Sequence, residues 1–136
     1  MDIIVTSIAG LPWFLAYLGT ALVLTLAYVF IYIWVTPHPE MKLIRENNLA
    51  AALAFGGSLL GFSLPLANTV ASSVSLLDAA IWGAIAIVVQ IGVYFLVRLS
   101  MPRISERIAS GETASGVWLG AASLTGGLLN AACMTY

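Results

Sequence analysis

Charged side chains are scarce in this sequence. Of its 136 residues only 8% are charged, five of them basic and six acidic, whereas 61% are hydrophobic. Soluble domains carry about 25% charged residues, so this composition excludes an ordinary water-facing surface and favours a polytopic membrane protein. The basic residues stand singly and the net charge is −1. The sequence therefore lacks the electrostatic footprint of a nucleic-acid-binding protein.

Cysteine and histidine each occur once, as Cys133 and His38. A single cysteine excludes an intramolecular disulfide framework, and the pair cannot assemble a metal cluster without carboxylates nearby. No nucleophile and base are arranged for catalysis, so we expect neither an enzyme nor a bound cofactor. We expect His38 to be solvated and Cys133 to be a buried small hydrophobe rather than a bridge to a second subunit. The N-terminus lacks the basic region of a signal peptide, which predicts that it stays in the mature protein.

Four apolar runs are long enough to cross a bilayer, which takes about 20 helical residues. They cover approximately residues 11–35, 49–74, 79–99 and 114–135. Each run is continuous, without the alternation of membrane strands, so helices are favoured over a barrel. The sequence predicts an all-α membrane protein with four transmembrane helices, forming a single domain over residues 1–136.

The second and fourth runs are built largely from Ala, Gly and Ser. Small residues in membrane helices allow two backbones to approach closely, so we expect these two helices to pack together at the centre. The candidate packing residues are Gly56, Gly57, Gly61, Gly116, Gly120 and Gly127. Because small residues occupy more than one face, we also predict a homo-oligomer, most simply a dimer. The alternative is that the first and third helices cover both faces.

All basic residues lie in the first and third connections between the runs. They are Lys42, Arg45, Arg98, Arg103 and Arg107. Cytoplasmic loops carry an excess of Lys and Arg. This asymmetry predicts that both connections are cytoplasmic and that both termini face outward.

The two halves of the chain resemble each other after a shift of 64 residues. This shift pairs Gly56 with Gly120 and Ile44 with Ile108. Each half has a bulky run, a proline, a charged turn, a polar cap and a small-residue run in the same order. We therefore expect two parallel two-helix repeats, at about 11–74 and 75–136, related by an axis along the membrane normal.

Three stretches carry a family resemblance. They are TPHPE at 36–40, LIRENNLAAALAFGGSLLG at 43–61, with Pro65 beyond it, and the closing GLLNAACMTY. With these motifs the chain resembles the YjfL-type family of small bacterial inner-membrane proteins. The resemblance implies four membrane helices in two repeats and a plasma-membrane location. It supplies no molecular activity, and some relatives resemble parts of envelope-stress gene sets.

No Asp, Glu, Lys or Arg lies deep in a predicted span, which argues against a carboxylate-coupled transporter. The deepest polar candidates are Gln90, Asn130 and Asn68. Such residues either line a path through the membrane or bond neighbouring helices together, and we favour the second role.

Two functions remain open from the sequence. The preferred one is a non-enzymatic scaffold or envelope-stress-linked partner, embedded in the lipid bilayer. It would bind a cytoplasmic or membrane protein through the charged turns at 40–46 and 103–112. The alternative is an oligomeric channel or uniporter for a small ion or solute, with polar residues of several subunits along the path.

Overall fold

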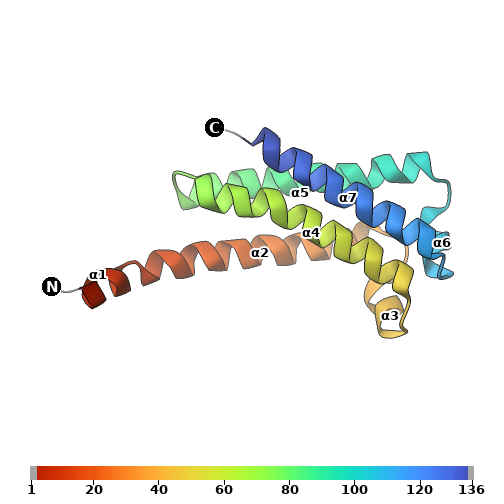
Figure 1. Cartoon of the computed structure of the whole chain (residues 1–136), viewed down its shortest axis with the longest axis horizontal. Helices are drawn as coiled ribbons and strands as arrows, with labels where there is room; N and C mark the ends of the chain where they lie inside the picture. The colour runs from red at the N-terminus through yellow and green to blue at the C-terminus, as the bar shows by residue number, and fades with distance from the viewer. Residues whose placement is uncertain (1–2, 135–136) are drawn as a thin grey trace.

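The computed structural model describes residues 3–134, and helices make up nearly all of this stretch (Figure 1). The elements are α1 (Ile3–Ala9), α2 (Leu11–Val35), α3 (Glu40–Arg45), α4 (Leu49–Ser72), α5 (Leu76–Ser100), α6 (Ile104–Ala109) and α7 (Thr113–Cys133). Four spans are long and apolar enough to cross a membrane: α1 together with α2, then α4, α5 and α7. The expected all-α fold with four such spans is confirmed. Helix α5 begins earlier than expected because Ser75 caps it, accepting a hydrogen bond from the Asp78 amide at 3.1 Å.

Helices α4 and α7 cross in direct contact at the centre of the bundle (Figure 1). A Cβ built on Gly57 would lie 2.5 Å from the Cα of Gly120, far inside the usual contact distance of about 3.5–4.0 Å. Only hydrogen atoms fit between the two backbones at this point. The small-residue composition of the two runs is therefore what permits this crossing.

Helix α2 lies at the edge of the bundle rather than wrapping its centre. Only Tyr28 and Tyr32 are buried on it, and α1 with the start of α2 extends past the ends of the other helices (Figure 1). The sequence did not predict α1. The helical run starts at Ile3 and breaks at Gly10, because Pro12 has no N–H and its ring would clash with the carbonyl of Ile8.

The two short helices, α3 and α6, lie at the same end of the bundle (Figure 1). We call this the basic end, because the five Lys and Arg residues lie on α3, on α6 and its N-cap, and in the last turn of α5. Asn48 joins the short helices to the core. Its Oδ1 caps α4 at the Ala51 amide, 3.0 Å away, and its Nδ2 donates to the Ile108 carbonyl at 3.0 Å.

The short helices end in the same way. Helix α3 is followed by Asn47 at φ 64°, and α6 is followed by Gly111 at φ 89°, a left-handed conformation that Asn and Gly adopt most readily. Their amides bond the carbonyls of Ile44 and Ile108, each at 3.0 Å. Each pair of equivalent residues is separated by the 64 positions found in the sequence.

Candidate functional site

Five of the six candidate glycines lie at the crossing of α4 and α7. Gly57 faces Gly120, Gly116 faces the backbone of Ala50, and Gly127 faces the backbone of Gly61. Gly56 is the exception, since a Cβ there would meet nothing within 4 Å. Successive residues of a helix are turned by about 100°, so Gly56 cannot face α7 while Gly57 does.

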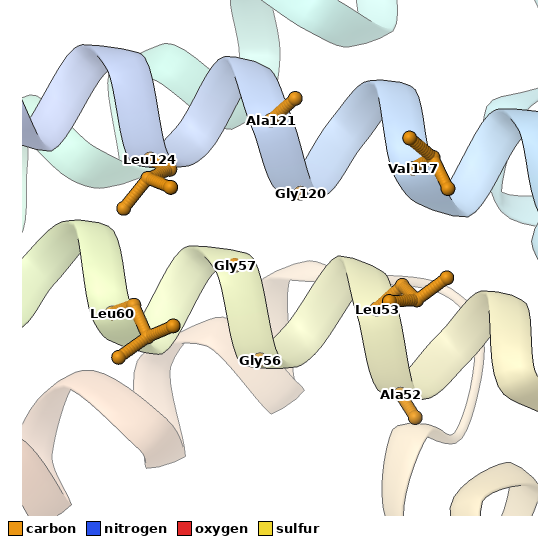
Figure 2. A pocket seen from close by; sticks show the side chains of 9 residues that line it. All are labelled: Ala52, Leu53, Gly56, Gly57, Leu60, Val117, Gly120, Ala121 and Leu124. Carbon is orange, nitrogen blue, oxygen red and sulfur yellow. The ribbon is translucent and has the colours of Figure 1, made fainter.

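Gly56 instead lines an open apolar groove of about 340 Å³ along the outer side of α4 and α7 (Figure 2). The groove is lined by Ala52, Leu53, Gly56, Gly57, Leu60, Val117, Gly120, Ala121 and Leu124. Leu53, Leu60 and Leu124 are 37%, 59% and 40% exposed. The glycines thus form the floor of a groove whose walls are exposed leucines.

Two of the three candidate amides bind helices together. Gln90 on α5 is buried, and its Nε2 donates to the carbonyls of Ser123 on α7, at 2.8 Å, and Ser58 on α4, at 3.3 Å. Asn68 donates to the Ala131 carbonyl at 3.0 Å and the Met134 carbonyl at 3.3 Å. The Nδ2 of Asn130 is buried without a hydrogen-bond partner in the described part of the chain. Gln90 and Asn68 therefore join helices within one chain, which does not favour the channel alternative.

A column of buried tyrosines runs from Gln90 towards the basic end. Tyr28 stacks on Phe62 with ring centroids 4.5 Å apart, and its hydroxyl bonds Ser58 Oγ. Tyr32 meets Tyr94 edge-on at 5.9 Å. The hydroxyl of Tyr32 is buried and has no hydrogen-bond partner among residues 3–134. We did not single out Tyr28 and Tyr32 from the sequence, although their spacing of four places them on one helical face.

A buried polar cluster follows the C-terminal end of α2. It consists of Thr36 and His38 in the linker and Glu40, the first residue of α3, which are 5%, 4% and 1% exposed. The Thr36 hydroxyl bonds the Tyr32 carbonyl at 2.8 Å and also contacts Oε1 of Glu40. His38 Nε2 lies 3.4 Å from the same carboxyl oxygen. Burial raises the pKa of Glu40 to about 7 and lowers the pKa of His38 to about 4.

Three expectations from the sequence are wrong here. His38 is not solvated, and Glu40 is not part of an exposed docking turn, because the linker between Pro37 and α3 packs against the end of α2. Cys133 is exposed rather than buried, and it is the last residue of α7. In the described residues, no group of three His, Cys, Asp or Glu side chains could hold a metal ion.

A small cleft of about 170 Å³ opens beside the cluster at the basic end. It is lined by Pro37, His38, Pro39, Ser105, Glu106 and Ala109. His38 therefore lines this cleft and also lies next to the carboxyl of Glu40.

Comparison with known proteins agrees with this picture. The chain is 46% identical over 123 residues to UPF0719 inner membrane protein YjfL of Escherichia coli (strain K12), covering 90% of this chain and 93% of the relative. It is 28% identical over 103 residues to UPF0719 transmembrane protein YshE of Bacillus subtilis (strain 168), covering 74% and 77%. Neither name states an activity, and no solved structure matches the chain.

The family model described as Domain of Unknown Function (DUF350) matches residues 6–134, nearly the whole chain. This match and the identity to YjfL confirm the resemblance seen in the motifs at 36–40 and 43–61. This chain is similar to the inner membrane protein YjfL over most of its length. It therefore belongs to the DUF350 family of inner-membrane proteins.

Proposed function

We propose that the protein is a non-enzymatic scaffold of the bacterial inner membrane, which associates with copies of itself and with partner proteins. The observation that carries the proposal is the open groove over Gly56 (Figure 2). The polar groups Gln90 and Asn68 are used within the chain, and α4 and α7 touch along their backbones. What the bundle offers to its surroundings in the membrane is thus an apolar surface with an open groove.

The occupant of this groove is a second copy of the chain. In a membrane, helices associate through close packing rather than through the hydrophobic effect. A glycine that faces lipid therefore adds no packing energy between helices. A twofold dimer brings the same patch of both copies together. Leu60 of one copy can then fill the space over Gly56 of the other, and the leucine walls interdigitate.

Disulfide crosslinking in native membranes tests this arrangement. Leu60→Cys in a Cys133→Ser background should crosslink to a dimer under mild oxidation, because the twofold axis passes along the groove. Val88→Cys on α5 is the matched control, since Val88 is 71% exposed but lies outside the groove. Crosslinking of the Val88 variant in place of the Leu60 variant would contradict the proposed dimer.

The proposed orientation places the basic end in the cytoplasm and both termini in the periplasm. Support comes from the gathering of the basic residues on α3, α6 and the last turn of α5, together with the positive-inside rule. The described ends of the chain lie at the opposite end of the bundle (Figure 1).

Partner proteins would bind the charged surface of the basic end. Lys42, Arg45 and Glu46 are exposed on and after α3. On α6, Arg103 lies 3.8 Å from Glu106, and both side chains are about three-quarters exposed. Such exposed ion pairs add little stability and can be exchanged for those of a partner. Charge reversal at Lys42, Arg45 and Arg103 should release the proteins that co-purify with the wild type, and their retention would contradict this docking surface.

The internal repeat is part of the same proposal. Helices α3 and α6 begin at Glu40 and Ile104, and both are followed by a left-handed residue, Asn47 or Gly111. These equivalences support a duplicated two-helix unit whose two small-residue helices, α4 and α7, meet at the centre. A chain with the second half replaced by a copy of the first should still insert into the membrane and fold. Size-exclusion chromatography in mild detergent should then give a single symmetric peak.

A further inference from the structure

The Thr36 hydroxyl lies between two oxygen acceptors. It has one hydrogen, and the Tyr32 carbonyl, which also accepts the Thr36 amide at 2.9 Å, lies 2.8 Å from it. The same hydroxyl oxygen also contacts Oε1 of Glu40. One hydrogen cannot bond both oxygens fully at the same time. A neutral carboxylic acid at Glu40, donating to the Thr36 hydroxyl oxygen, would satisfy both contacts.

The surroundings of Glu40 agree with a neutral acid. Among the described residues no Lys or Arg forms an ion pair with it, and a buried carboxylate without a cation is costly. The titratable groups that face it are Tyr32 from α2 and His38 from the linker. Helix α4, which packs against α3, has no titratable residue. On α6, Arg103 and Glu106 pair with each other, and Arg107 lies 3.7 Å from Glu112.

The cluster can also hold the ionised form. The hydroxyl of Tyr32, both nitrogens of His38 and Oε2 of Glu40 are buried and have no hydrogen-bond partner among residues 3–134. A neutral histidine donates from one nitrogen, and a tyrosine donates its hydroxyl. The same buried cluster thus holds two donors and one carboxyl oxygen without hydrogen-bond partners, and His38 Nε2 lies 3.4 Å from the other carboxyl oxygen, Oε1. Unpaired buried polar groups are costly, and ionisation of Glu40 would give these donors an acceptor.

His38 provides the route to water. It lines the cleft between the linker and α6, and its Nε2 lies 3.4 Å from Oε1 of Glu40. His38 therefore contacts both the cleft and the carboxyl.

We propose that Glu40, Thr36, Tyr32 and His38 form a proton-binding site at the basic end of the bundle, loaded through the cleft beside His38. In the loaded state, the carboxylic acid donates to Thr36, which donates to the Tyr32 carbonyl. On release, the proton passes to water or buffer in the cleft and leaves a carboxylate. The Thr36 hydroxyl then turns its hydrogen to the carboxylate and gives up the Tyr32 carbonyl. The last turn of α2 is thereby coupled to the occupancy of the site.

Infrared spectroscopy of the purified protein measures this proton directly, because a carboxylic acid and a carboxylate absorb at different frequencies. A carboxylic acid band should disappear with a midpoint at about pH 7, the pKa that burial gives Glu40. Glu40→Gln, which mimics the neutral acid, should abolish the band and leave the fold intact. Glu46→Gln, at an exposed glutamate after the same helix, is the control and should retain it.

Thr36→Val supplies a second readout in a folded protein. Thr36 bonds both forms of Glu40, but its bond to the charged carboxylate is the stronger one. Removing the hydroxyl should therefore move the midpoint to higher pH, whereas Thr36→Ser should leave it near the wild-type value. The proposed proton-binding site would be overturned if the carboxylic acid band remained in Glu40→Gln. It would also be overturned if Thr36→Val left the midpoint of the titration unchanged. A midpoint that falls with NaCl but not with choline chloride would overturn it in favour of a site for a metal cation.

Discussion

Substitution of Gly57 by alanine tests the backbone contact on which the bundle is built. The added Cβ would lie 2.5 Å from the Cα of Gly120 and 2.6 Å from its carbonyl carbon. Ordinary contact needs about 3.5 Å, so α4 and α7 must separate by about 1 Å at their crossing. These Gly120 atoms belong to the backbone, which cannot rotate away as a side chain would.

The free energy of this change has two opposing parts. Replacing a mid-helix glycine by alanine stabilises a helix by about 1 kcal/mol. Overpacking a close contact costs about 1–3 kcal/mol, and separation of the helices also weakens their neighbouring contacts. The difference of these parts is a destabilisation of about 0–2 kcal/mol, and we expect Gly57→Ala near the upper end because the neighbouring contacts weaken as well.

Gly92→Ala is the matched control, because Gly92 lies on α5 and a Cβ there would meet nothing within 4 Å. Only the helix-propensity gain applies, so this variant should be as stable as the wild type or more so. Unfolding in detergent, followed by circular dichroism as denaturing detergent is added, compares the three proteins. If Gly57→Ala proved as stable as Gly92→Ala, α4 and α7 could not cross as closely as described.

Three further predictions follow from the polar groups and the charges. Gln90→Leu, which keeps the volume but removes two interhelical hydrogen bonds, should lower the unfolding free energy by about 1 kcal/mol, and an unchanged value in the same detergent titration would show that Gln90 does not join the helices. Burial raises the pKa of Glu40 from 4.5 to about 7 and lowers that of His38 from 6.5 to about 4, so their effects on stability oppose each other. In His38→Gln only Glu40 remains, so the unfolding free energy should fall as the pH rises from about 4.5 to 7. In Glu40→Gln only His38 remains, so the unfolding free energy should rise from about pH 4 to 6.5. Equal slopes of unfolding free energy against pH in the two variants would refute the assignment. In intact cells, an impermeant thiol reagent should label exposed Cys133, but should reach Arg103→Cys in a Cys133→Ser background only after permeabilisation, and the reverse pattern would invert the orientation.

Much of the helical framework could be predicted from the sequence, because the length of an apolar run and its content of small residues can be read from each segment alone. The run expected at 11–35 coincides with α2, and the glycines at 57 and 120 meet across the crossing. Helix α1 was missed because a proline two residues after a glycine marks either a helix start or a break within a longer helix.

The polar cluster could not be predicted in the same way. Glu40 directly follows Pro39 in a charged turn, where a glutamate is usually solvated, and its burial depends on how the linker packs on α2. The sequence shows neither that packing nor the orphaned hydroxyl of Tyr32. The exposure of Cys133 likewise depends on which face of α7 meets α4.

The mass of the protein in mild detergent tests the scaffold proposal most directly. Native mass spectrometry of the wild type should give twice the chain mass of 14.3 kDa. Gly56→Leu, which fills the groove (Figure 2), should give the single-chain mass, and Gly92→Leu on the exposed side of α5 should remain a dimer. A single-chain mass for the wild type at every concentration would contradict the account.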